Sequence, residues 1–231
     1  MLVSEKVTIF VLINLHVAVM RKVIYCILYI VLFVGLPVKA SRPIRQWFVV
    51  MPDSLMPLLT QNNRLDFIDF MDCGMEAVVT NRMDGKSRMS VLTDEYLHIG
   101  YTASTDVTMR LLPLNDSTDV LCMVTTVKAP VKDSRICFYD EGWRLLEVGS
   151  FLTKPELADF RPTGTGEEDR PSWEKLGVLF STYHLSADTT ALECRLTSVD
   201  YLSKDDKEAL HLAELPFIKY VWEDGKFKKD E

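Results

Sequence analysis

The stretch WFVVMPDSLMPLLTQNNRLDFIDFMDCGMEAVVTNRMDGK, residues 47–86, is where the chain changes from a helical to an extended pattern. Between Leu55 and Met71 apolar residues recur at steps of three and four, which is typical of helices with one buried face. From Ala77 the apolar period becomes two, and the tripeptide 83–85 (Met-Asp-Gly) separates two short extended runs. This pattern predicts a β-hairpin, and Gly85 is available for a positive φ in its turn. Short helices that lead directly into a sheet predict an α+β fold.

The sequence around these helices also predicts where they begin and end. Prolines oppose an early helix, so we expect residues 41–52 to be an extended lead-in. We expect Asp53 to cap a first short helix and Asn62 or Asn63 to cap a second. Gly74 suits the C-terminal stop of the second helix. The helices of Pro52–Met75 should then pack on one face of the sheet.

The rest of the chain predicts a mainly antiparallel β meander, because alternating runs follow one another through short turns. The expected strands are 77–81, 87–92, 96–101, 106–112, 120–127, 135–139, 143–148, 177–185, 189–196, 217–222 and 226–228, with a short helix from Ser203 to Ala213. Residues 150–172 are rich in proline, glycine and acids and are the candidate boundary between two subdomains. A weak likeness between 107–146 and 190–228 raises the alternative of a duplicated β unit.

The N-terminus has the pattern of an export signal. Met20-Arg21-Lys22 precedes an uncharged apolar run, Val23 to Leu36, and short residues lead to Ala40. We therefore expect residues 1–40 to be a signal region that is cleaved near Ala40, with Met20 as the true start, and residues 41–231 to be the exported domain. The alternative is a retained anchor made of both early apolar runs. In the first interpretation the only contact with a membrane is through the signal.

The charge of the chain disfavours nucleic acid as a partner. The formal net charge is -7, and removal of residues 1–40, which hold four bases and one acid, leaves about -10. An acidic surface repels phosphate backbones.

Residues that carry chemistry are sparse. The three histidines of the exported part, His98, His184 and His211, do not have the spacing of a metal site, and no nucleophile elbow or phosphate loop occurs. Three aspartates (66, 69 and 72) share one helix face, which a solvated face explains better than calcium binding. We predict no catalytic residue, no metal site and no cofactor.

The best candidate for a binding surface is a polar cluster at the helix start and the first hairpin, where backbone amides and polar side chains can meet. Capping and turn formation are the simpler explanation of the same residues. The cluster consists of Asn62, Asn63, Arg64, Asn81, Arg82, Asp84 and Lys86.

The exported part has an even number of cysteines. Two disulfides are allowed in an exported protein, but a domain of this size does not need them, and small buried hydrophobic side chains are the other interpretation. The four residues are Cys73, Cys122, Cys137 and Cys194.

Three segments resemble a known family: MPDSLMPLLTQNNRLDFIDFMD at 51–72, VTNRMDGKS at 79–87 and VLTDEYL at 91–97. They are similar to an uncharacterised domain-of-unknown-function family of exported proteins from anaerobic Gram-negative gut bacteria. The resemblance covers most of residues 41–231. It implies a periplasmic or outer-membrane-associated protein, and it implies no activity and no site residue.

These observations leave three functions open. The first is a non-catalytic exported module that binds another envelope protein or an extracellular glycan, since we expect exposed aromatics at Trp143, Trp173 and Trp222. The second is a carrier of a small ligand or lipid in a cavity between helices and sheet. The third is a hydrolase, which requires a carboxylate and a histidine to converge in one pocket.

Overall fold

The computed structural model describes residues 20–22, 25, 42–128, 130–160, 179–209 and 217–230. The chain divides into two units, 1–40 and 41–231. Almost all of the expected signal region, with its cleavage point at Ala40, lies outside the described residues. None of the helices in the described part combines the length and apolar character that crossing a membrane requires.

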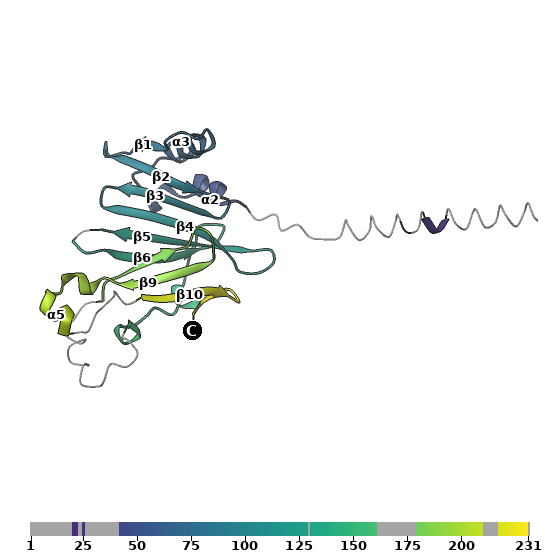
Figure 1. Ribbon diagram of the computed structural model, residues 1–231. Coiled ribbons are helices and arrows are strands. Elements are labelled where there is room, and N and C mark those ends of the chain that lie inside the picture. The colour runs from purple at the N-terminus through teal and green to yellow at the C-terminus, as the bar shows by residue number, and fades with distance from the viewer. Residues whose placement is uncertain are drawn as a thin grey trace, which may run out of the picture. The chain divides into compact units, whose positions relative to one another are not determined.

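Two antiparallel sheets form the second unit (Figure 1). The larger sheet has seven strands in sequence order: β1 Val78–Thr80, β2 Lys86–Leu92, β3 Tyr96–Thr102, β4 Thr105–Pro113, β5 Asp119–Val127, β6 Asp133–Tyr139 and β7 Leu145–Leu146. The smaller sheet has the order β11-β10-β9-β8, with β8 Ser181–Leu185, β9 Ala191–Leu196, β10 Phe217–Glu223 and β11 Lys226–Lys229. The predicted α+β fold with an antiparallel meander is confirmed.

The helices before the first strand differ in part from the prediction. The extended lead-in at 41–52 was wrong, because Ile44–Val50 forms helix α2. Ile44, Trp47 and Phe48 lie at helical spacing and are fully buried, so packing of this stripe outweighs the flanking prolines.

The second helix, α3 Gln61–Asp72, follows the 3₁₀ turn Asp53–Leu55, and its N-cap lies two to three residues before the expected caps, Asn62 or Asn63. Thr60 is the N-cap, and its Oγ1 accepts a hydrogen bond from the Asn63 backbone N–H at 3.1 Å. The Asn63 side chain accepts in return from the Thr60 N–H at 3.1 Å, which completes a capping box. Gly74, with φ +65°, follows the helix as predicted.

The turn between β1 and β2 also differs from the prediction in one detail. Asp84, rather than Gly85, takes the positive φ, at 57°. A side chain at Gly85 would lie 3.2 Å from Asn81 Nδ2, so the glycine is needed for close approach.

The larger sheet is covered on both faces, which makes the unit three layers deep. On β4, β5 and β6 successive side chains alternate between two hydrophobic clusters, as in Met123 and Cys137 on one face and Cys122 and Phe138 on the other. The first face packs on α2 and α3, which confirms the predicted helix layer, and the second packs on the smaller sheet.

The alternation of side chains between the two faces of the larger sheet also explains why Cys122 and Cys137 do not form a disulfide. Cys122 and Cys137 belong to different clusters on opposite faces of the sheet, so their sulfurs cannot pair. All four expected cysteines are free in the structure; Cys122, Cys137 and Cys194 are buried, whereas Cys73 is exposed after α3. The three buried thiols therefore fit the interpretation as small hydrophobic side chains.

Two buried side chains tie the smaller sheet to the larger one. Arg110 of β4, with 4% exposure, donates from Nη1 to the backbone carbonyls of Ser186 at 2.8 Å and Ala187 at 3.0 Å, in the turn between β8 and β9. Trp222 of β10 donates from Nε1 to the Pro113 carbonyl at 2.8 Å. These bonds hold the β8–β9 hairpin over the second face of the larger sheet.

The predicted short helix after Ser203 is present as α5 Lys204–Ala209. Its expected continuation to Ala213 lies outside the described residues. The remaining elements are 3₁₀ turns at Val148–Ser150, Leu157–Phe160 and Ser198–Tyr201. Between β7 and β8 the chain passes through the candidate boundary 150–172, of which residues 150–160 are described.

Candidate functional site

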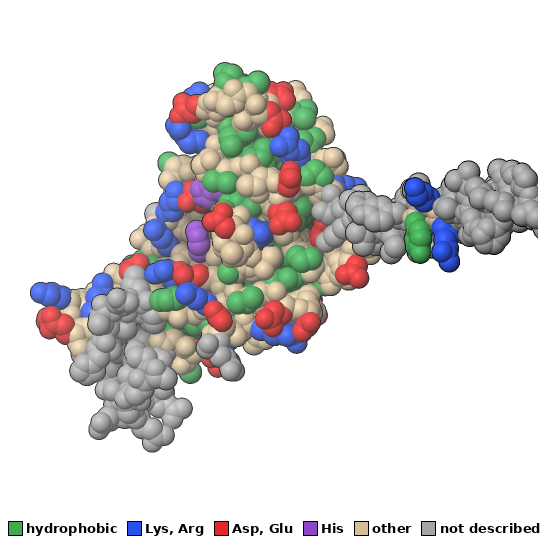
Figure 2. Space-filling view, turned by 45° about the vertical axis from the view of Figure 1, so that its right-hand side comes forward, with side chains coloured by type: hydrophobic (Ala, Val, Ile, Leu, Met, Phe, Trp, Pro, Cys, Tyr) green, Lys and Arg blue, Asp and Glu red, His purple; other side chains and the backbone are tan. Residues whose placement is uncertain are grey.

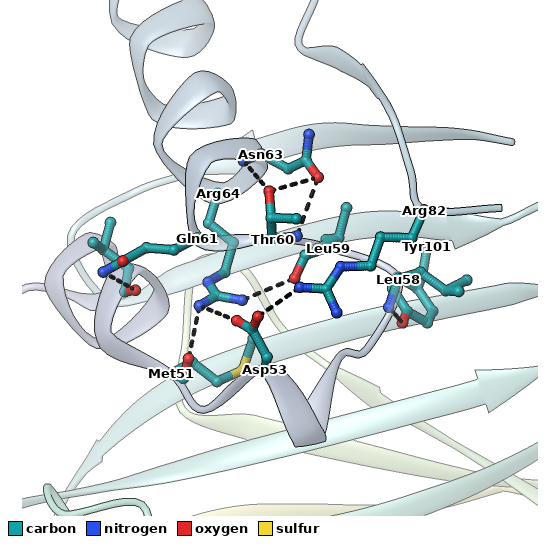
Figure 3. Close-up of polar contacts among 11 residues, drawn as sticks. Met51, Asp53, Leu58, Leu59, Thr60, Gln61, Asn63, Arg64, Arg82 and Tyr101 are labelled. Carbon is teal, nitrogen blue, oxygen red and sulfur yellow. Dashed lines mark hydrogen bonds and ion pairs between the residues drawn. The ribbon is translucent and has the colours of Figure 1, made fainter. Parts of the chain in front are cut away.

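Three of the predicted surface residues, Asn63, Arg64 and Arg82, lie together around Asp53 and the start of α3 (Figure 3). Arg64 is buried and donates from Nη2 to the Met51 carbonyl at 2.7 Å and to Asp53 Oδ1 at 3.0 Å, and from Nη1 to the Leu59 carbonyl at 3.1 Å. Arg82 donates to the other oxygen of Asp53 at 2.8 Å. The Asp53 carboxylate thus lies between two guanidinium groups.

This arrangement explains the charge state of Asp53 and corrects its predicted role. The hydrogen bond from Arg64, more than any other interaction, lowers the pKa of the Asp53 carboxyl, and the charges of Arg64 and Arg82 act in the same direction. Pro52, rather than Asp53, is the N-cap of the turn Asp53–Leu55. The function of Asp53 is to join the loop after α2 to α3 and to the first hairpin.

The other members of the predicted surface also serve the local fold or face solvent. Asn81 is buried; its Oδ1 accepts from the N–H groups of Met83 and Gly85, and its Nδ2 donates to Ser87. Lys86 donates to the Thr80 hydroxyl at 2.7 Å. The remaining two residues, Asn62 and Asp84, are exposed.

A larger polar feature, which the sequence reasoning did not single out, crosses the part of the larger sheet that the smaller sheet leaves open. It consists of two adjoining hollows, of about 750 Å³ and 680 Å³, that share Asp106 and Lys128. We call their combined lining the open-face groove. The first hollow includes Asn81, Lys86 and Arg88, so two of the predicted surface residues border it.

The second hollow brings together the two sheets. His98 from β3 and Thr108 from β4 line it from the larger sheet, and His184 from β8 and Glu193 and Arg195 from β9 line it from the smaller sheet. Lys132, which precedes β6, completes the rim. Figure 2 shows the imidazole side chains, in purple, close together on this face with basic side chains beside them.

The open-face groove is more basic than the protein as a whole. It contains five bases and three acids: Lys86, Arg88, Lys128, Lys132, Arg195, Glu76, Asp106 and Glu193. Each acid is paired internally. Asp106 pairs with Lys128 at 2.8 Å, and Glu76 and Glu193 pair with Arg88 and Arg195.

Two bases of the groove therefore remain for a ligand. Within the described residues Lys132 has no ion-pair partner, and Lys86 contacts only a neutral hydroxyl. Because the acids of the groove are already neutralised, these lysines give it a local positive charge on an acidic protein.

His98, one of the two histidines in this groove, does not have the contacts of a catalytic base. His98 Nδ1 lies 2.7 Å from the hydroxyl of the exposed Ser90, and Asp106 lines the same hollow. In the described part of the chain, however, no carboxylate is hydrogen-bonded to the His98 ring, and Asp106 is bound by Lys128. No group of three or more potential metal ligands occurs among the residues that the structure describes.

The groove brings together two histidines that the sequence did not connect. His98 and His184 were predicted to be surface or core-edge residues, and both line one hollow because β8 packs across β4 to β6. His211 lies outside the described residues. The only sign of the groove in the sequence was the polar side chains at alternate positions of β2 to β5. The same pattern is found on any sheet face that is exposed to solvent.

The expectation of exposed tryptophans was wrong where the structure tests it. Trp143 is 9% exposed and packs edge-on against Trp47. Trp222 is 7% exposed and stacks with Phe138 and Phe151 between the sheets. Trp173 lies outside the described residues. Neither described tryptophan offers a platform to a sugar.

Comparison with known proteins places the chain in an uncharacterised group. Residues 38–227 match a family described as Protein of unknown function (DUF3256). A solved structure titled "Structure of a domain of an uncharacterized protein from Porphyromonas gingivalis W83" is similar, with 26% identity and a TM-score of 0.73, over 82% of this chain and 100% of that chain. No curated protein matches this sequence.

Proposed function

Because the chain belongs to the family of proteins of unknown function DUF3256, which carries no activity to transfer, we propose a function from the groove itself. The protein is an exported, non-catalytic binding module, and its open-face groove holds an acidic segment of another envelope protein. The observation that carries the proposal is the accumulation of basic side chains from both sheets in two adjoining hollows.

Charge complementarity supports an acidic partner. The internal ion pairs neutralise the acids of the groove, so Lys86 and Lys132 are left to contact carboxylates. Threonine hydroxyls at Thr108, Thr126 and Thr182 add hydrogen-bonding groups along the same lining. A hollow of this polarity suits an extended polar chain better than an apolar ligand.

A protein partner is favoured over a glycan. Sugar rings bind well on exposed aromatic faces, but Trp143 and Trp222 are buried, and Tyr183, which lines the second hollow, is only 8% exposed. We therefore place the partner among acidic proteins of the periplasm or outer membrane.

The proposal of export rests on the signal pattern of residues 1–40. The test is the N-terminal sequence of the protein recovered from the cell envelope. Export with cleavage predicts an N-terminus at Ser41, whereas a retained anchor made of both early apolar runs predicts a chain that still contains residues 1–40.

Binding is tested by capture from envelope extracts with the protein as bait. We expect Lys132→Glu to abolish capture of an acidic partner, because it reverses an unpaired charge in the groove. The matched control is Lys154→Glu, which reverses an exposed charge outside the groove and should leave capture unchanged. Equal capture by both variants would exclude the groove as the contact surface.

A second candidate function is supported by a mainly apolar hollow of about 500 Å³ beside α2 and α3, lined by Val49, Val50, Leu65 and Ile68 together with Arg42, Arg45 and Gln46. The predicted carrier cavity between helices and sheet is not supported, since Trp47, Phe48 and Met56 fill that interface with exposures of 0–1%. A carrier would have to use the outer hollow. Binding of a fluorescent fatty acid that Leu65→Glu abolishes would favour this function, and absence of binding would exclude it.

A further inference from the structure

The second hollow of the open-face groove has an unusual composition for a binding surface, because two of its lining groups are imidazoles. His98 and His184 come from different sheets and face one hollow. The other charged side chains that line this hollow are Asp106 on β4, Lys128 and Lys132 between β5 and β6, and Glu193 and Arg195 on β9.

The internal ion pairs determine the net charge that a ligand meets there. Lys128 is neutralised by Asp106 and Arg195 by Glu193, so with neutral imidazoles the hollow carries the single charge of Lys132. Protonation of both histidines would raise the local charge from one to three. The hollow therefore becomes a much stronger site for anions as the pH falls.

The environment of His98 keeps this charge low until a ligand binds. Burial is the main factor that lowers the pKa of His98, and the nearby charges of Lys128 and His184 act in the same direction, against the opposing effect of Asp106. The free imidazole is therefore neutral at pH 7 and above. A carboxylate in the hollow would favour the charged form, so binding and protonation reinforce each other.

We propose that the His98–His184 pair, together with Lys132, binds a carboxylate side chain of the partner and makes the affinity of the groove rise as the pH falls. This inference rests on the proposed function, since it assumes an acidic protein segment in the groove. It adds the position of one contact and a pH dependence that a groove of lysines and arginines alone would lack.

The test measures binding of a rhodamine-labelled octa-aspartate peptide to the purified full chain by fluorescence anisotropy, at pH 8.0 and pH 5.5 and constant ionic strength. The aspartates stay ionised across this range. We expect the Kd to fall by about fivefold for each histidine that becomes protonated, or roughly 25-fold in all. His98→Gln and His184→Gln should each remove part of this dependence, and the double variant nearly all of it. Lys154→Gln is the control and should retain it.

A second measurement uses only the wild-type protein, so it does not depend on whether the variants fold. In the wild-type protein, saturating peptide should raise the pKa of the His98 imidazole, which is followed by NMR titration of its ring protons. Peptide binding with the same Kd at both pH values, or a dependence that survives in the double variant, would overturn the histidine inference alone. Absence of binding at both pH values would overturn the proposed function with it. Tighter binding of a sulfated oligosaccharide than of the peptide would overturn the choice of a protein partner.

Discussion

Replacement of Arg64 by methionine should destabilise the protein strongly, although the residue was first predicted as part of a binding surface. The guanidinium is 2% exposed and binds two backbone carbonyls, of Met51 and Leu59, as well as Asp53. Methionine fills much of the same volume but cannot donate. The carbonyls of two buried residues would then lose their partner.

The magnitude follows from these contacts. A buried polar group without a partner costs about 1–3 kcal/mol, and two such carbonyls give roughly 2–6 kcal/mol. Removal of a buried charge offsets part of this cost, so we expect a loss of about 3–4 kcal/mol in the free energy of unfolding. In urea, with a slope of about 2 kcal/mol per M, the midpoint would fall by roughly 1.5–2 M.

The assay is urea unfolding followed by tryptophan fluorescence, because Trp47 and Trp143 lie in the core beside α2. Arg82→Met is the matched control, since Arg82 donates to the same carboxylate but is half exposed. We expect only a minor fraction of the Arg64 loss for this control. A loss below about 1 kcal/mol for Arg64→Met, or equal losses for the two variants, would refute the assignment of Arg64 to the structural framework.

Two further predictions follow from buried side chains. Among the four cysteines of residues 41–231, Ellman's reagent should modify only Cys73 in the native protein, and the other three thiols only after unfolding, because they are buried and burial raises the pKa of Cys122 and, to about 11, that of Cys194; rapid labelling of all four of these thiols would contradict the two-cluster core. Burial also raises the pKa of Tyr139 to about 12 from an ordinary value near 10, so the stability from its neutral form is complete below pH 10 and is lost as the pH rises from 10 to 12. Ultraviolet titration of the phenol and unfolding measured across that range test this, and Tyr139→Phe should remove its part of the alkaline loss.

Prediction from the sequence was most accurate where a local pattern was sufficient. The period of two after Ala77 located the meander, and Gly74 marked the end of α3, since its φ of +65° is a backbone preference rather than a contact. Prediction was less accurate at α2, where the buried stripe of Trp47 and Phe48 outweighed neighbouring prolines. Packing of that kind depends on a sheet that forms elsewhere in the chain.

The candidate site was harder to predict for the same reason. Asn81 and Arg64 have the polar character of a surface, but a turn and a buried loop use that polarity internally. His98 and His184 lie 86 positions apart in the sequence, and their meeting depends on how the β8–β9 hairpin is held by Arg110. No pattern within one strand contains that information.

The sequence by itself determined the class of the fold, the order of its strands and the scarcity of reactive groups, because alternation, turn residues and composition act over short distances along the chain. Only the tertiary structure decided how much of the second face of the larger sheet is covered and which polar residues remain open to a ligand. The smaller sheet covers part of that face and leaves the rest as a groove, and its position is set by contacts between residues that are distant in the sequence.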